Sequence, residues 1–186
     1  MGGWMELFQA VEGCRGCGLC QGRRYPVPGE GNPEAALMLI GEGPGGDEDR
    51  LGRPFVGRSG QLLTGMLESI GLSRQQVYIA NVVKCRPPGN RTPTPDEAQA
   101  CLPFLRRQVA LVRPKIILLL GSTAARYTIG GDVRIRRDHG TWTYRAGVWM
   151  MPTYHPSALL RDPPRKLEAW QDLQALAEKM KELELC

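Results

Sequence analysis

Several features that would identify broad classes of protein are missing from this sequence. No apolar run approaches the roughly 20 residues that a membrane-spanning helix needs. The first residues, MGGWMELFQA, lack the basic-then-apolar order of a signal peptide. No internal repeat and no long linker divides the 186 residues. We therefore expect one domain, 1–186, of a cytoplasmic protein with no membrane partner.

A glycine-rich stretch, GEGPGG (41–46), lacks the features of the common nucleotide-binding loops. No Gly-Lys-Ser/Thr follows it, as a Walker loop requires, and it does not match the dinucleotide fingerprint. It follows ALMLI (36–40), which looks like a buried strand. Open α/β sheets keep their ligand crevices at the carboxyl ends of strands. Glu42, surrounded by glycine and proline, is therefore a candidate functional residue.

Strand-like and helix-like segments alternate along the chain, which indicates a mainly parallel sheet covered by helices on both faces. Proline and glycine make 85–95 a loop, and 14–33 looks irregular. The expected strands are 36–40, 77–83 and 115–120, with a strand pair at 141–144 and 148–154. The expected helices are 59–72, 95–112, one directly after 120, and 165 to the end.

Six cysteines in a chain with no export signal favour a metal site over a disulfide framework. Cys14, Cys17 and Cys20 form a C-x2-C-x2-C run. Cys85 follows a strand, and Cys101 lies in the next helix. Four thiolates suit either a tetrahedral zinc or a [4Fe–4S] cluster, and the spacing does not decide between them. The alternative is that Cys85 and Cys101 are small buried hydrophobic residues.

Histidine is scarce, with only two in the chain. His139, in RRDHG, reads as a solvated residue of a surface loop. His155 directly follows a strand and precedes a proline, at a position where a site residue can lie. Asn81 stands in an otherwise apolar strand, where its amide needs partners for one acceptor and two donors. A ligand with matching groups would explain it.

The net charge is +5, and arginine supplies 19 of the 24 basic residues. Arginine forms bidentate contacts with phosphate, which makes a nucleic-acid partner plausible. The other reading is a GC-rich genome, which raises arginine and proline together.

Four motifs, in order, carry a resemblance: GEGPGGDED, GRPFVG, IANVVKCRPPGNR and HPSALLR. With the cysteine layout, they resemble the family 4 uracil-DNA glycosylases, the iron–sulfur enzymes of bacteria and archaea. The similarity runs from about Cys14 to Arg161. It implies a three-layer α/β/α fold and hydrolysis of the N-glycosidic bond of uracil in DNA, which leaves an abasic site. The partner would be uracil-containing DNA, single- or double-stranded, bound by a monomer.

Two related families fit less well. Family 5 glycosylases usually have no acid at the position of Glu42. A DNA-crosslinking relative carries a histidine-bearing insert in the loop that reads RPPGNRTP here, and this loop has no histidine. The chain also departs from family 4 in two places. Cys20 is an extra cysteine, and Ala158 stands where the family often has an aromatic residue.

The resemblance assigns a role to each residue of the base pocket. Phe55 would stack on the uracil, and Asn81 would bind its O4 and N3–H edge. His155 would donate to O2 as negative charge develops there. A carboxylate near the sugar would stabilise the cation or position water, and Glu42, Asp47 and Glu48 are all candidates. The uracil-binding set is Gly41, Glu42, Gly43, Phe55, Asn81 and His155, with Glu42 and His155 catalytic.

The resemblance also assigns the cofactor and the DNA contacts. Cys14, Cys17, Cys85 and Cys101 would hold a [4Fe–4S] cluster, with Cys20 free and Cys186 uninvolved. HPSALLR would form a loop pressed on the duplex. Its DNA-contacting residues would be Ser157, an apolar wedge at Leu159 or Leu160, and Arg161 on a phosphate.

Two other functions remain to be weighed. An iron–sulfur protein could recognise DNA without cutting it, although the presence of Glu42, Asn81 and His155 together speaks against this. An electron-transfer protein is disfavoured, because the cysteines are dispersed rather than gathered in a ferredoxin-like run.

Overall fold

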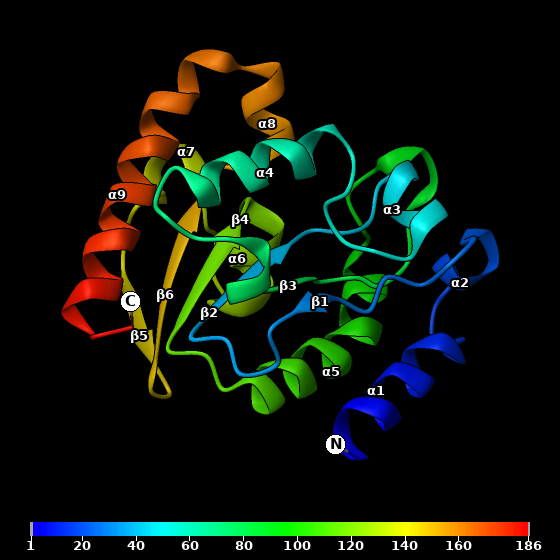
Figure 1. Cartoon of the computed structure of the whole chain (residues 1–186). Helices are drawn as coiled ribbons and strands as arrows, with labels where there is room; N and C mark the ends of the chain where they lie inside the picture. The colour runs from blue at the N-terminus through cyan, green and yellow to red at the C-terminus, as the bar shows by residue number, and fades with distance from the viewer. Residues whose placement is uncertain (1, 186) are drawn as a thin grey trace.

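A single sheet forms the centre of the computed structural model, which describes residues 2–185 (Figure 1). Within these residues the sheet has six strands in the order β1-β3-β2-β4-β6-β5. The four inner strands run parallel, and the two edge strands are antiparallel to their neighbours. The strands are β1 (Glu30–Gly31), β2 (Leu37–Gly41), β3 (Tyr78–Asn81), β4 (Ile116–Leu120), β5 (Thr143–Arg145) and β6 (Val148–Thr153). The expected mainly parallel sheet and its terminal strand pair are confirmed.

Helices cover both faces of the sheet, as Figure 1 shows. Because successive strand residues point to opposite faces, Leu37 and Leu39 pack under α4, α8 and α9, while Met38 and Ile40 pack under α5 and α6. The three-layer α/β/α fold is therefore confirmed. The helices are α1 (Gly2–Glu12), α2 (Leu19–Gly22), α3 (Gly46–Leu51), α4 (Arg58–Glu68), α5 (Pro95–Val112), α6 (Ser122–Thr128), α7 (Ile135–Asp138), α8 (Pro156–Arg161) and α9 (Lys166–Glu182).

The longest helix, α5, begins and ends where its sequence signals predict. The Thr94 hydroxyl accepts from the Glu97 N–H at 3.3 Å, and the Glu97 carboxylate accepts from the Thr94 N–H at 2.8 Å. This reciprocal cap satisfies two N–H groups at the helix start, and Pro95 lacks an N–H that would need a partner.

The sequence predictions miss five of the helices described: α1, α2, α3, α7 and α8. No regular element is expected in residues 2–12, yet they form α1, whose Glu6 pairs with Arg107 of α5 at 2.6 Å. Three short stretches outside the expected helices are also helical: 19–22 (α2), 46–51 (α3) and 135–138 (α7). HPSALLR was also expected to be a loop, but Pro156–Arg161 form α8. Across residues 2–185, no helix combines the length and apolar character needed to cross a membrane.

Candidate active site

A cavity of about 570 Å³ opens at the edge of the sheet where the four parallel strands end. Each strand contributes to its wall: Glu42 follows β2, Asn81 ends β3, Gly121 follows β4, and His155 lies two residues after β6. Open α/β sheets bind ligands at this edge. Phe55 also lines the cavity, so the structure brings the expected base-pocket side chains together.

The backbone of 41–43 lies against its neighbours so closely that a side chain would not fit. A Cβ on Gly41 would lie 2.4 Å from Asn81 Oδ1 and 2.6 Å from the Phe55 ring. A Cβ on Gly43 would lie 2.7 Å from Val83. These glycines therefore let the main chain approach the cavity floor where Asn81 and Phe55 meet.

Glu42 is the carboxylate that the structure holds in the cavity. Its Oε2 accepts from the Thr123 hydroxyl at 2.5 Å, and the Thr92 hydroxyl lies 3.5 Å from the same oxygen. Thr123 belongs to the first turn of α6, so the carboxylate is anchored to the element that follows β4. Asp47, the second candidate, instead pairs with Arg50 at 2.9 Å on the surface.

Glu48, the third candidate, is a buried carboxylate that holds main-chain N–H groups. Its Oε1 accepts from Val56 at 2.8 Å and from Gly57 at 2.9 Å, and its Oε2 accepts from Gly45 at 3.1 Å. Because three N–H groups already use its oxygens, Glu48 is poorly placed to orient water. Of the three carboxylates, the geometry favours Glu42.

Asn81 is 1% exposed, and its Oδ1 has no hydrogen-bond donor among residues 2–185. An unsatisfied buried acceptor costs about 1–3 kcal/mol. The residue lies beside Gly41 in the β2–β3 register, so its side chain borders the cavity. The orphaned oxygen therefore indicates a ligand that donates a hydrogen bond to it.

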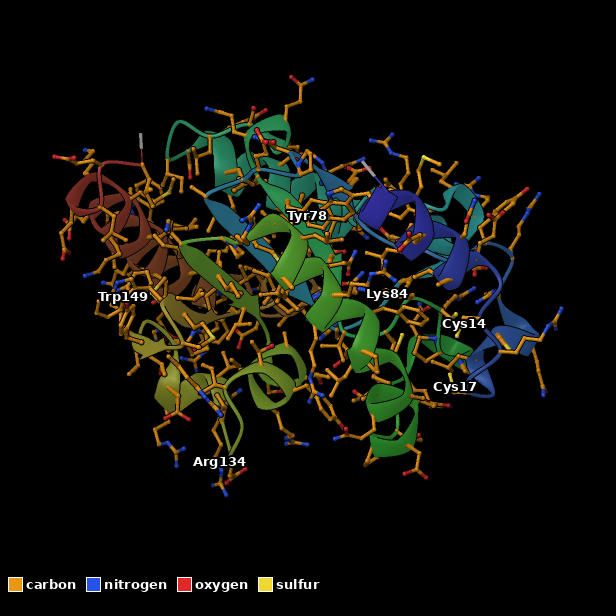
Figure 2. All side chains as sticks on the ribbon, turned by 90° about the horizontal axis from the view of Figure 1, so that it is seen from below. Cys14, Cys17, Tyr78, Lys84, Arg134 and Trp149 are labelled. Carbon is orange, nitrogen blue, oxygen red and sulfur yellow. The ribbon has the colours of Figure 1, made fainter. Side chains whose placement is uncertain are left out.

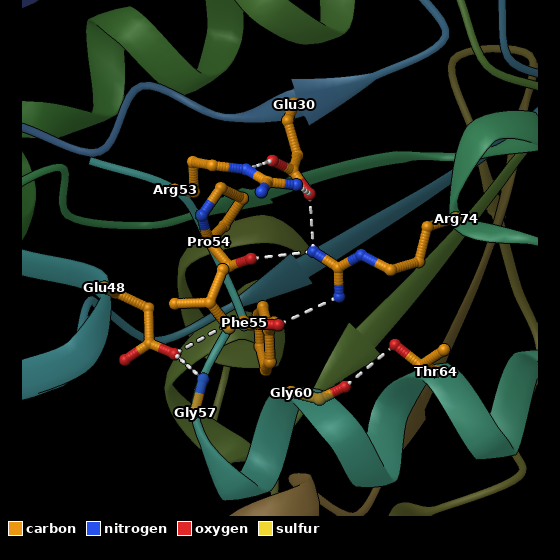
Figure 3. A network of polar contacts seen from close by, with 10 residues as sticks. Glu30, Glu48, Arg53, Pro54, Phe55, Gly57, Gly60, Thr64 and Arg74 are labelled. Atoms are coloured by element: carbon orange, nitrogen blue, oxygen red, sulfur yellow. Dashed lines mark hydrogen bonds and ion pairs between the residues drawn. The ribbon is translucent and has the colours of Figure 1, made fainter. Parts of the chain in front are cut away.

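Phe55 forms one wall of the cavity, with its ring centroid 5.5 Å from that of His155 and the planes inclined by 33°. Its backbone is unusual, because φ is 51°, in the left-handed region that side-chain-bearing residues rarely adopt. Figure 3 shows the polar contacts around this turn. The side chain is 6% exposed.

His155 is oriented by Ser157, in the first turn of α8. Its Nδ1 lies 3.1 Å from the Ser157 backbone nitrogen and 2.8 Å from the Ser157 hydroxyl. A backbone N–H can only donate, so Nδ1 accepts, and the neutral ring carries its proton on Nε2. Burial lowers the pKa of His155 to about 4, and the Arg161 guanidinium adds to this effect. At neutral pH, His155 is therefore a neutral Nε2–H donor at the cavity.

Of the two leucines in helix α8, Leu159 is the core residue. Leu159 is 1% exposed and belongs to the hydrophobic cluster beneath α4 and α9. It cannot also be a wedge that enters DNA, so that candidate is wrong. Leu160 is partly exposed, while Ser157 and Arg161 line the cavity. Leu160 therefore remains the candidate wedge.

The expectation of a solvated His139 is wrong. Its Nδ1 lies 2.9 Å from Asp172, whose other oxygen accepts from the Thr153 hydroxyl at 2.6 Å. The ring centroid of His139 also lies 5.0 Å from that of Tyr154, the residue before His155, with the two planes inclined by 45°. It thus ties the end of β6 to α9. Sequence reasoning missed this because Asp172 lies 33 residues away.

Five cysteines line one apolar pocket: Cys14, Cys17, Cys20, Cys85 and Cys101. Figure 2 shows Cys14 and Cys17 at the same end of the molecule as the first turns of α5. Arg23 donates to Cys85 Sγ at 3.1 Å, and the Lys84 N–H donates to Cys101 Sγ at 3.3 Å. Cys186 lies outside the described residues.

The sulfurs of this pocket are of the kind that bind either zinc or an iron–sulfur cluster. Burial raises the pKa of Cys85, and it raises that of Cys101 to about 11, so these thiolates need a metal or cation nearby. Within residues 2–185, no three Cys, His, Asp or Glu side chains are grouped tightly enough for one ion.

Two residues that shape the site were not found from the sequence. Thr123 had a weak signal, because GST directly follows the strand KIILLL. Arg74 had none. It contacts the backbone of residues 54 and 55 from a 3-10 turn 19 residues downstream.

Comparison with known proteins agrees with this geometry. The profile of the Uracil DNA glycosylase superfamily matches residues 28–174. A type-4 uracil-DNA glycosylase of Sulfurisphaera tokodaii is 43% identical over 93% of this chain and 83% of its own length. The type-4 enzyme of Thermotoga maritima is 45% identical over 88% of this chain and 86% of its length. The type-4 enzyme of Saccharolobus solfataricus is 43% identical over 92% of this chain and 84% of its own length. The chain therefore belongs to the uracil-DNA glycosylase superfamily, in its type-4 family.

Proposed function

We propose that this enzyme removes uracil from DNA by hydrolysing its N-glycosidic bond, releasing free uracil and leaving an abasic site. The observation that carries the proposal is the buried, unpartnered Oδ1 of Asn81 beside the Phe55 ring, at the end of a parallel strand. The type-4 relatives bear the name of this activity. One chain supplies the cavity and its polar groups, which suits a monomer.

The base would be read on its Watson–Crick edge. Asn81 Oδ1 accepts from uracil N3–H, which satisfies the orphaned oxygen, and its amide N–H donates to O4. Cytosine presents the opposite pattern, an acceptor at N3 and an amino donor at C4, so it is rejected. Phe55 stacks on the flipped ring.

Bond cleavage would leave its electron pair on the base. As the C1′–N1 bond breaks, N1 takes the pair, and the resulting anion spreads onto O2. The neutral Nε2–H of His155 donates to O2 there. A donor aimed at developing charge stabilises the transition state more than the bound substrate.

Glu42 would act on the sugar side of the same bond. Its carboxylate, held by Thr123, faces the positive charge that develops on the sugar as the base departs. Water then adds to C1′ and loses a proton, which Glu42 or the solvent accepts. The uracil anion takes up one proton from solvent at N1, which matches the proton that water loses, so the products are neutral uracil and the abasic site.

The DNA would lie across the mouth of the cavity. Arg161 ends α8 at this mouth and would contact a phosphate, with Ser157 contacting the strand nearby. Leu160, partly exposed on the same helix, would fill the space that the flipped base leaves. The net charge of +5 favours the DNA backbone as a partner.

Cys14, Cys17, Cys85 and Cys101 would hold a [4Fe–4S] cluster. Two facts support this: the pocket that these cysteines share and the hydrogen bonds to the two buried sulfurs. When bound, the cluster joins the N-terminal segment to the 85–101 region. Uracil release transfers no electrons, so its contribution is structural.

The test is incubation with an oligonucleotide that carries one uracil, followed by alkali. We expect strand scission at the uracil and none in matched oligonucleotides with thymine or cytosine at that position. Binding of the uracil oligonucleotide without release of the base would instead support a non-catalytic DNA-binding module.

A further inference from the structure

Two side chains hold the main chain on both sides of Phe55 (Figure 3). Arg74 donates from Nη2 to the Pro54 carbonyl at 2.8 Å and from Nη1 to the Phe55 carbonyl at 2.9 Å. Glu48 accepts through one oxygen from the N–H groups of the next two residues, at 2.8 and 2.9 Å. Four main-chain polar groups of residues 54–57 are therefore held by two charged side chains from different elements.

The turn needs such support because of the conformation of Phe55. A residue with a Cβ is unfavourable at φ 51°, and such a conformation persists only where its surroundings impose it. The start of α4 also presses on the turn, since a Cβ on Gly60 would lie 1.8 Å from the Phe55 carbonyl oxygen. Relaxing the backbone would turn the Phe55 ring away from His155.

Each of the two side chains is itself anchored. Arg74 pairs with Glu30 at 2.6 Å, and its side chain is only 20% exposed. Glu48 also accepts from the Gly45 N–H, in the loop that carries Glu42. Glu48 thus joins the turn that presents the stacking ring to the loop that presents the proposed catalytic carboxylate.

We infer that Glu48 and Arg74 are positioning residues that set the stacking wall of the base pocket by holding Phe55. This inference rests on the proposed function and deepens it. Stacking acts on the base both before and during bond cleavage, so loss of the wall weakens retention of the flipped base more than it slows the chemical step.

Arg53 provides a matched control for Arg74. It pairs with the same Glu30 at 2.7 Å, but its side chain is 63% exposed and makes no contact with the carbonyls of the turn. We expect R74Q to raise the half-saturating concentration of uracil DNA by about 5- to 50-fold, within the range for loss of one base stack. The single-turnover rate at saturation should change much less, and R53Q should stay within about twofold of wild type.

A double-mutant cycle tests whether Arg74 acts through Phe55. If it does, R74Q adds little in an F55A background, so the effects are strongly non-additive. The same multiplicative loss in both backgrounds would overturn the inference. So would R74Q behaving like R53Q.

Amide exchange at Val56 and Gly57 tests the Glu48 contacts without using activity. We expect E48A to speed exchange at both amides, and E48Q to restore protection, because the glutamine carbonyl can still accept from them. D47N, which changes the exposed neighbour, serves as the control. If E48A does not fold, the E48Q and R74Q proteins provide the comparison. The inference would be overturned if R74Q showed wild-type exchange rates at both amides and wild-type affinity for uracil DNA. Failure of the wild-type protein to release uracil would contradict the proposed function alone.

Discussion

At the scale of single residues, Asn81 carries the specificity of the proposed reaction. In Asn81→Asp, the carboxylate cannot donate to uracil O4 and repels it, but it can accept from the amino group of cytosine. We expect uracil excision to fall by about 10²-fold or more, because polar groups of the site are left without partners. A trace of cytosine excision should appear. Single-turnover rates on matched U·G and C·G duplexes measure both, and undiminished uracil activity would contradict the role of Asn81.

His155 should affect the chemical step and not binding. Removing a donor aimed at a developing oxyanion costs on the order of 10²–10³ in rate. We therefore expect His155→Ala to slow single-turnover cleavage by that factor while affinity for uracil DNA changes little. Cleavage by His155→Ala at the wild-type rate would contradict the proposed role of His155 in the mechanism. It would not affect the family assignment.

The ionisation of His155 gives a pH prediction. Folding lowers its pKa from about 6.5 to about 4, so the unfolded chain binds a proton in this range that the folded protein does not. The stability that comes from a neutral His155 is therefore present above pH 6.5 and is lost as the pH falls toward 4. NMR titration of the two imidazoles, assigned with H139Q, should show His155 neutral down to about pH 4. A midpoint near 6.5 would contradict the neutral donor.

At the scale of elements, α8 shows how one short helix serves both packing and binding. Leu159 is buried in the core, Leu160 is partly exposed, and Arg161 lines the cavity. We expect Leu160→Ala to reduce cleavage of double-stranded substrate more than of single-stranded, because only a duplex leaves a gap to fill. Equal losses on both would argue against a wedge.

Leu159→Ala is the control for this experiment. Truncation of a buried leucine costs about 2–5 kcal/mol, so denaturant unfolding should show a clear loss of stability. Leu160→Ala should leave the unfolding midpoint close to that of wild type. A destabilisation as large as that of Leu159→Ala would make Leu160 a core residue.

At the scale of the whole molecule, the cysteine pocket joins segments that are far apart in the sequence. We expect purified protein to be brown with broad absorbance in the blue, and Cys14→Ser to lose iron and lower the melting temperature. Cys20→Ser should keep its iron, as the matched control from the same pocket. A colourless protein with one equivalent of zinc would contradict the cluster, and loss of iron in Cys20→Ser alone would reassign its ligands.

Elements with strong local signals could be predicted from the sequence. Helix α5 was placed at its observed bounds because its cap and its proline lie next to each other in the chain. Strand β4 was placed within one residue, because a run of six apolar residues is a local property. The short elements could not be predicted. The two residues of β1 form a strand only by pairing with β3, and α1 is held by contacts with α5.

The sequence by itself determined the fold class, the family resemblance and the candidate site residues at the ends of strands. Only the tertiary structure decided which candidates have free polar groups. Two sets of contacts distinguish the role of Glu42 from that of Glu48. Glu42 accepts from Thr123, 81 residues away in the sequence, whereas Glu48 accepts from main-chain N–H groups. The contact with Asp172 fixes the position of His139, and the contact of Arg74 with the Phe55 carbonyl fixes that of Phe55. The physical reason is that hydrogen bonding and burial depend on which groups meet in space, and local sequence does not contain those distances.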